Sequence, residues 1–269
     1  MLKNIKGNFN IIIANLPYQE SAAVVFDHHA SEIIRNTSHK QNHIILSDSP
    51  SAARVIYEYF GGYKAFPKID LSLIAAVDQS DSAGFTVNEV LNPSGWILLS
   101  FLMDARTGLG RFRDFSISNV QLMLNLIDHC RNCPIEDILK LPDVLERANL
   151  YFEHQQKAGE QILRCSRKIQ KLVILDLRKE EIIYCANRFF LYALFPDANV
   201  SIHVLWGLHK QNTVFAMGKS IFDRSCKINL GELALRYGGG GHNAAATCQI
   251  INEDAEGVLT KLSETLSEN

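Results

Sequence analysis

Short apolar runs alternate with amphipathic helical patterns along the first half of the chain, and this alternation limits the choice of fold. The runs at 9–16 and 23–26 are typical of buried strands, whereas 51–61 and 71–81 carry apolar residues at helical spacing. Strands that alternate with helices form a parallel sheet with helices on both faces. We therefore predict an α/β fold whose N-terminal part is a parallel sheet of this kind.

The second half of the chain is richer in strands. Residues 119–165 are mostly helical in pattern, with breaks near two prolines. Apolar runs at 171–177, 201–208 and 213–220 then predict strands, and a helix is expected after the glycine run. We predict a smaller α/β domain with a mixed sheet at the C-terminal end.

A chain of 269 residues with 47% hydrophobic residues is long enough for two domains, each with its own core. We predict a domain over residues 1–145, a helical linker over 146–165 and a smaller domain over 166–269. A net charge of −2 gives no overall attraction to nucleic acid or to a membrane. The apolar runs are too short to span a bilayer, and the N-terminus lacks the pattern of a signal peptide.

The six cysteines show no disulfide-scaffold pattern, and we expect reduced thiols in a cytoplasmic protein. Cys130 and Cys133 form a single C-x-x-C pair. Without a second pair or a histidine at zinc-ligand spacing, this pair is weak evidence for zinc. A zinc protein stays open as a minor alternative.

The apolar run at 24–26 ends directly in Asp27-His28-His29. Ligand sites in open parallel sheets gather at the carboxyl ends of the strands. Imidazole and carboxylate groups bind divalent metals, and a neighbouring carboxylate can fix the tautomer of a histidine. We predict that one histidine binds metal, that the other faces substrate and that Asp27 orients them. The alternative is a polar turn after a strand.

Two more carboxylates, Asp78 and Asp81, close the apolar segment "AAVDQSD". In the same sheet they would reach the edge that carries Asp27. Two metal ions bridged by carboxylates are the usual arrangement for displacing a phosphoryl oxygen. The pattern therefore indicates metal-dependent chemistry on a phosphate ester.

A glycine run lies near the C-terminus, in "RYGGGGHNAAA" at 236–246. Consecutive glycines let backbone N–H groups approach a ligand, and the following alanines predict a helix whose N-terminus favours an anion. We predict an anion site here, with a flexible turn as the alternative. Just upstream, Lys219, Ser220 and Arg224 suit a carboxylate or a phosphate.

Three arginines lie beside glycines in "DARTGLGRFRD": Arg106, Arg111 and Arg113. They suit phosphate binding. A structural loop, with Asp104 and Asp114 as partners of the arginines, is an equal alternative.

Taken together, these motifs resemble the DHH phosphoesterase superfamily with its C-terminal DHHA1 domain, and most closely its exopolyphosphatase-related branch. The resemblance rests on "FDHHASE" at 26–32, "DARTGLGRF" at 104–112 and "YGGGGHNAAATCQ" at 237–249, and it covers nearly the whole chain. It implies hydrolysis of phosphoester or phosphoanhydride bonds in oligonucleotides, cyclic dinucleotides, polyphosphate or pyrophosphate. It also implies two divalent metals, commonly manganese, in a cleft between the two domains.

The resemblance implies a role for each matching residue. His28 would be a metal ligand, His29 would face the scissile phosphate and Asp27 would support both. Asp78 would be the later carboxylate ligand, with Asp81 as the alternative. The substrate-binding residues would be Gly238, Gly239, Gly240, Gly241, His242, Arg224, Ser220, Arg106 and Arg111.

The sequence departs from the family pattern at its start. The acidic D-x-D motif is absent, because only eight residues precede the first predicted strand. Asn15 stands where the family has a carboxylate, and a neutral amide is a poor bridge between two dications. Three interpretations compete: the sequence starts at an internal methionine of a longer, active protein; the chain is a remnant that lost catalysis; or the protein binds one metal weakly. We favour the first interpretation, because the other motifs are intact.

We predict a metal-dependent phosphoesterase that hydrolyses phosphodiester or phosphoanhydride bonds of a nucleotide, oligonucleotide or polyphosphate. Manganese is the expected metal and magnesium the alternative. The competing hypothesis is a catalytically inactive protein of the same fold that binds a nucleotide or a nucleic-acid end. The expected partner is a phosphate-containing small molecule or short nucleic acid rather than a membrane. An exposed edge of an incomplete sheet favours a homodimer.

Overall fold

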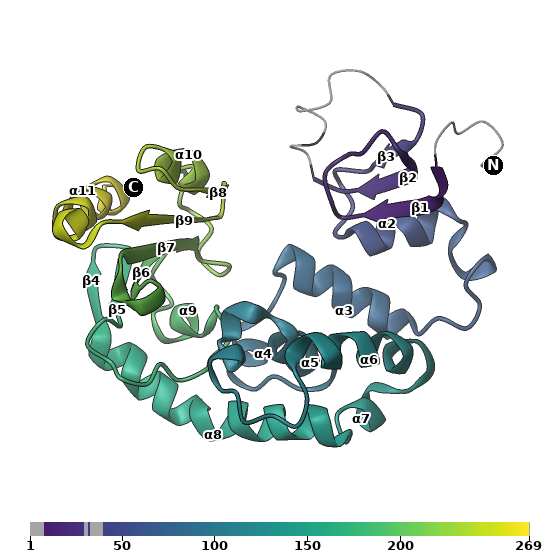
Figure 1. The fold of residues 1–269 in the computed structure, drawn as a ribbon, viewed down its shortest axis with the longest axis horizontal. Coiled ribbons are helices and arrows are strands. Elements are labelled where there is room, and N and C mark those ends of the chain that lie inside the picture. The colour runs from purple at the N-terminus through teal and green to yellow at the C-terminus, as the bar shows by residue number, and fades with distance from the viewer. Residues whose placement is uncertain (1–7, 30–31, 33–39, 269) are drawn as a thin grey trace. The chain divides into compact units, whose positions relative to one another are not determined.

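A computed structural model of the protein describes residues 8–29, 32 and 40–268. The chain divides into two compact units (Figure 1). Unit 1 comprises the chain up to Phe85 together with Ile127–Cys133, and unit 2 comprises Thr86–Leu126 and the chain from Pro134 onwards. The domain boundaries expected from the sequence stay a prediction.

Unit 1 is built on a parallel sheet. Within the described residues its strands are β1 (Asn8–Ala14), β2 (Ala22–Asp27) and β3 (His43–Ile45), in the order β1-β2-β3. Helices α2 (Ala52–Tyr59) and α3 (Leu71–Ser82) follow. The N-terminal parallel sheet expected from the apolar runs is confirmed.

Helix α2 covers one face of this sheet. Val55 packs with Val24 and Phe26 of β2, and all three side chains are fully buried. Ser51 caps the helix, because its side-chain oxygen accepts a hydrogen bond from Arg54 N at 3.0 Å. Burial of β2 along its whole length fixes the position of the polar residues that follow it.

Helices form the first part of unit 2. They are α4 (Val87–Leu91), α5 (Gly95–Met103), α6 (Asn119–Asn132, whose last residues belong to unit 1), α7 (Ile135–Ile138), α8 (Pro142–Cys165) and α9 (Phe190–Leu194). Pro134 directly precedes α7, and Pro142 is the first residue of α8, where a missing N–H costs nothing. The predicted helical stretch with breaks at these prolines is confirmed, and the expected linker at 146–165 lies within α8.

A mixed sheet forms the second part of unit 2. Its strands are β4 (Ser166–Ile169), β5 (Leu172–Asp176), β6 (Val200–Trp206), β7 (Thr213–Lys219), β8 (Gly240–His242) and β9 (Ala245–Ile250). Their order among the described residues is β4-β5-β6-β7-β9-β8, and β5 and β6 are the parallel neighbours. Helices α10 (Leu230–Leu235) and α11 (Ala255–Ser267) complete the unit. The mixed C-terminal sheet is confirmed.

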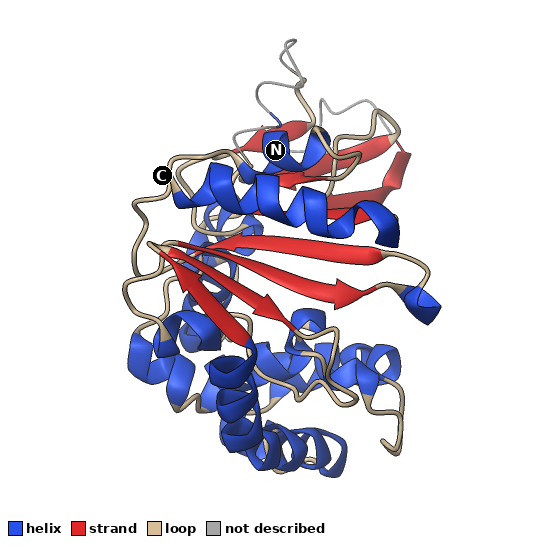
Figure 2. Cartoon of the chain, turned by 90° about the vertical axis from the view of Figure 1, so that its left-hand side faces the viewer, coloured by secondary structure: helices blue, strands red, loops and turns tan. Residues whose placement is uncertain are grey.

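The two faces of this sheet differ, as the alternation of side chains along a strand requires. On β6, Ile202 and Val204 point into a core shared with α10 and α11. Ser201 and His203 point to the other face, where α8 and α9 lie. Figure 2 shows the sheet with α11 along one side and α8 on the other.

The glycine run does not open a helix, so that part of the sequence-based prediction is wrong. It leads into a hairpin in which Gly241 pairs with Ala246 and Gly240 with Thr247. The alanines form β9, because their backbone also pairs with β7 over Thr213–Gly218. Pairing with a strand some thirty residues away overrides the local helical preference of alanine.

No helix in the described ranges is both long enough and apolar enough to cross a membrane.

Candidate functional site

Asp27 organises the histidine motif at the end of β2. The residue is buried, with 1% of its surface exposed. Oδ1 accepts hydrogen bonds from the backbone N–H of His28 at 2.7 Å and of His29 at 2.9 Å, and from His29 Nδ1 at 2.6 Å. Burial alone would raise the pKa of Asp27, but these hydrogen bonds outweigh it and lower the pKa. Asp27 is therefore an ionised carboxylate that holds the backbone of His28 and the ring of His29, and its role in catalysis stays a prediction.

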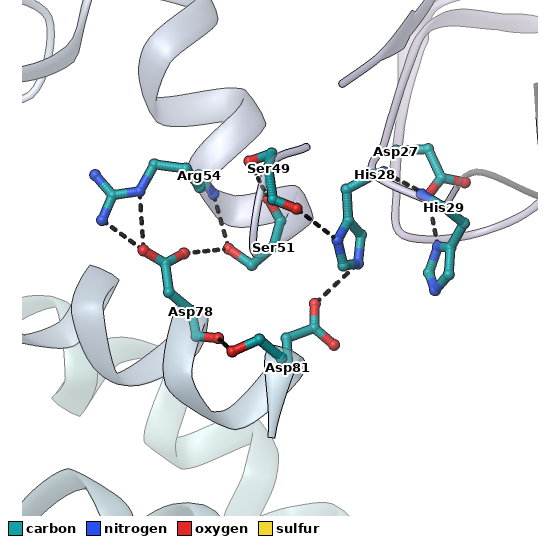
Figure 3. A network of polar contacts seen from close by, with 9 residues as sticks. Asp27, His28, His29, Ser49, Ser51, Arg54, Asp78 and Asp81 are labelled. Atoms are coloured by element: carbon teal, nitrogen blue, oxygen red, sulfur yellow. Dashed lines mark hydrogen bonds and ion pairs between the residues drawn. The ribbon is translucent and has the colours of Figure 1, made fainter. Parts of the chain in front are cut away.

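His28 presents one ring nitrogen to a carboxylate (Figure 3). Its Nδ1 lies 3.1 Å from the carbonyl oxygen of Ser49, which can only accept, so Nδ1 carries a proton. Nε2 is buried and lies 3.1 Å from Asp81 Oδ2, but without hydrogen-bond alignment. A ring nitrogen and a carboxylate oxygen this close are stabilised by a shared cation, either a proton on Nε2 or a metal ion bound by both groups. This arrangement fits a divalent metal.

Asp78 serves a different purpose from Asp81. Its Oδ2 accepts hydrogen bonds from Arg54 Nε at 2.9 Å and Nη2 at 2.5 Å, and its Oδ1 accepts one from Ser51 Oγ at 2.7 Å. These bonds tie α3 to the first turn of α2 (Figure 3). Asp81, one turn further along α3, is then the carboxylate that faces His28. The assignment of Asp78 as a metal ligand stays a prediction.

A second cluster adjoins Asp27. Ligand atoms of Asp27, Glu32 and His43 lie within 4.8 Å of one another. Burial lowers the pKa of His43, against the opposing charges of Asp27 and Glu32, so its imidazole is neutral. Two carboxylates and a neutral imidazole are a suitable donor set for a divalent cation. Sequence reasoning missed Glu32, although it closes "FDHHASE", and His43, which pairs with Val25 across β2 and β3.

Unit 2 contains a cavity of about 490 Å³, a size suited to a nucleotide. Four cationic side chains line it, and no aspartate or glutamate does so among the described residues; the four are Arg106, Arg111, Arg188 and Lys219. The rest of the lining is largely apolar. The cavity therefore suits an anionic ligand with an apolar part.

Asp104 holds two of these arginines. It accepts hydrogen bonds from Arg106 Nε and Nη2, each at 2.7 Å, and its Oδ2 lies 3.7 Å from Arg188 Nε. Burial would raise the pKa of Asp104, but the hydrogen bonds and charges of these arginines lower it overall. The sequence left open whether Arg106 pairs with Asp104 in a structural loop or binds phosphate. The pair with Asp104 is present, and Arg106 also lines the cavity.

The glycine run contributes to the same cavity through Gly240 and Gly241. A Cβ on Gly239 would lie 2.3 Å from Thr247 O, and one on Gly241 would lie 2.4 Å from Ala245 O. A Cβ on Gly240 would meet nothing within 4 Å. Close backbone pairing therefore explains two of the glycines, whereas Gly240 keeps space beside the cavity.

The other predicted substrate-binding residues do not line this cavity; they are Ser220, Arg224, Gly238, Gly239 and His242. Ser220 Oγ accepts hydrogen bonds from the backbone N–H of Phe222 and Asp223, each at 3.1 Å, and so shapes a turn. Arg224 Nε donates to Ile221 O at 3.2 Å. Their roles in binding stay predictions.

The zinc alternative gains no support from the structure. Cys133 Sγ lies 3.9 Å from His129 Nδ1, and burial raises the pKa of the Cys130 thiol. Neither cysteine belongs to a cluster of three or more metal-binding side chains in the described part of the chain.

Comparison with solved structures identifies the family. The chain is 55% identical to a pGpG-specific phosphodiesterase, PggH from Vibrio cholerae, over 96% of this chain and 83% of that one, with a TM-score of 0.82. That protein and this chain share the fold and more than half of the aligned sequence. The chain belongs to the DHH phosphoesterase family. The superfamily predicted from the motifs is thereby confirmed, whereas the reading of the chain start stays a prediction.

Two more distant solved structures share the fold alone. An exopolyphosphatase-related protein from Bacteroides fragilis is 14% identical over 91% of this chain and 64% of its own, with a TM-score of 0.50. The DHH domain of a member of a ribosomal protein family is 12% identical over 91% of this chain and 63% of its own, with a TM-score of 0.52. No protein-family model and no curated protein matches the chain.

Proposed function

We propose that this DHH protein is a metal-dependent phosphodiesterase that hydrolyses a short linear dinucleotide such as pGpG. The observation that carries the proposal is the 55% identity to a pGpG-specific phosphodiesterase over 96% of the chain. The motif geometry supports it independently, because His28 and Asp81 present a ring nitrogen and a carboxylate oxygen side by side. The cavity in unit 2, with its cationic and apolar lining, suits the nucleotide.

In the proposed site, His28 and Asp81 would hold a divalent ion, and the cluster of Asp27, Glu32 and His43 would offer further ligand atoms. Manganese suits this mixture of imidazole and carboxylate donors, and magnesium is the alternative. When bound, such an ion lowers the pKa of a water molecule and neutralises charge on the phosphoryl oxygens. Asp78 positions Asp81 through its bonds to Arg54 and Ser51.

His29 is the residue proposed to act on the scissile phosphate. Asp27 holds its Nδ1–H, so Nε2 is the nitrogen that can exchange a proton with the substrate. Water loses one proton as its oxygen bonds to phosphorus, the bond from phosphorus to the 3′-oxygen breaks, and the 3′-oxygen takes up one proton, so the protons balance. Hydrolysis of pGpG in this way yields two molecules of GMP.

A substrate panel tests the proposal. The 269-residue chain with manganese is incubated with pGpG, cyclic di-GMP, a longer oligonucleotide and polyphosphate, and the products are separated by chromatography. We expect GMP from pGpG, abolition by a chelator, and slower or no turnover of the others. If the chain binds pGpG but releases no GMP at any metal concentration, it is a binding protein and the proposed function is wrong.

A further inference from the structure

His203 is a polar residue on the apolar floor of the unit 2 cavity. It lies on β6, with Leu175 of β5 on one side and Ala216 of β7 on the other. All three residues line the cavity. The residue is only partly buried, and its ring nitrogens are not among the buried polar atoms without a partner, so they are open to a ligand that enters the cavity.

The neighbouring polar groups on this floor satisfy one another. Tyr192 OH lies 2.8 Å from Ser201 Oγ and donates to Gly218 O at 2.6 Å. By contrast, neither ring nitrogen of His203 has a hydrogen-bond partner among the described residues. Its ring N–H and its nitrogen lone pair are therefore both available to bind a ligand.

The ring of His203 is neutral. Burial, and secondarily the positive charge of Arg111, lowers the pKa of His203 to about 4. A neutral imidazole offers one N–H donor and one lone pair and adds no charge to attract phosphate. The four cationic side chains are the better binding partners for phosphate. The apolar floor, with one donor and one acceptor on His203, therefore suits a flat heteroaromatic group.

We propose that His203 hydrogen-bonds the edge of a nucleobase and so makes the cavity selective for nucleotides over other phosphate esters. The proposal rests on the proposed function for its substrate class, a guanine dinucleotide. It assigns His203 to ligand binding and places the base against Leu175 and Ala216.

Calorimetric titration with GMP and with ribose 5-phosphate tests this inference, because the two ligands differ only by the base. The full chain is compared with His203→Phe, which keeps a ring but removes both nitrogens, and with His203→Gln, which keeps a donor and an acceptor. We expect His203→Phe to weaken GMP binding about tenfold, the value of one lost hydrogen bond, and to leave ribose 5-phosphate binding unchanged. His203→Gln should restore most of the GMP affinity.

Equal GMP affinity in the wild type and His203→Phe would overturn the inference, as would an equal loss of both ligands. Hydrolysis of pGpG by the wild type is measured in parallel. If the wild type cleaves pGpG and His203→Phe binds GMP as tightly as the wild type does, this inference alone is overturned. A chain that binds GMP through His203 but leaves pGpG intact overturns the proposed function alone.

Discussion

Replacing Asp81 by asparagine is expected to lower kcat/KM for pGpG by more than about 100-fold. Loss of a residue that only supports a metal ligand costs up to about 100-fold, so loss of a ligand should cost more. Asparagine keeps the shape of the side chain but removes the charge that offsets a dication beside His28 Nε2, 3.1 Å away. The fold should be retained, because Asp81 is not part of the Arg54 network. Steady-state kinetics at several manganese concentrations measure the effect, and excess metal should restore part of the activity.

Asp78→Asn is the matched control, since it makes the same change one turn earlier on α3. It weakens the bonds to Arg54 and Ser51, so we expect a loss of about 1–3 kcal/mol in unfolding free energy. Manganese affinity should fall less than in Asp81→Asn, because Asp78 acts through the position of α3. If Asp78→Asn abolished manganese binding while Asp81→Asn bound it normally, Asp78 would be the ligand after all.

Gly241→Ala is expected to destabilise unit 2 by about 2–4 kcal/mol. The new Cβ would lie 2.4 Å from both Ala245 O and Ala246 Cα, which are backbone atoms that cannot rotate away. The residue also has φ of 153°, a conformation that side-chain-bearing residues rarely adopt. Thermal unfolding measures the loss, and GMP binding should fall with it as the β8–β9 hairpin is disturbed.

Gly240→Ala separates ligand binding from folding at the next residue. Its Cβ meets no protein atom within 4 Å, so the melting temperature should stay within about 2 °C of the wild type. Because Gly240 lines the cavity, GMP affinity should still fall several-fold. Gly257→Ala on α11 also adds a Cβ in open space but lies away from the cavity. It should lower neither the melting temperature nor the GMP affinity. A Gly241→Ala variant that melts like the wild type would contradict the packing argument.

The order of strands and helices could be predicted because local signals agree with the fold. The apolar run at 23–26 is the buried strand β2, and helical spacing at 51–61 and 71–81 corresponds to α2 and α3. Ser51 and Asp70 cap these helices with their own side chains, a signal that depends only on neighbouring residues. Asp27-His28-His29 could be placed for the same reason, since it directly follows the strand.

The remaining features depend on contacts between distant segments. Asp78 and Asp81 are both acidic residues near the end of one helix, and only the docking of α3 beside α2 decides which faces His28. The hairpin after the glycine run depends on pairing with β7. His203 is a lone histidine in an apolar strand. Its place in the cavity beside Arg111 depends on the packing of distant segments and could not be predicted from the sequence.

Manganese binding to the 269-residue chain, measured by calorimetry beside His28→Ala, tests the metal site most directly. The variant removes the ring whose Nδ1 is held by Ser49 O and whose Nε2 faces Asp81. We predict saturable manganese binding by the wild type. In the variant the affinity should be weaker by about tenfold or more, because a metal ligand is lost. Equal affinity in both proteins, or no binding by the wild type, would contradict a divalent-metal site at His28 and Asp81.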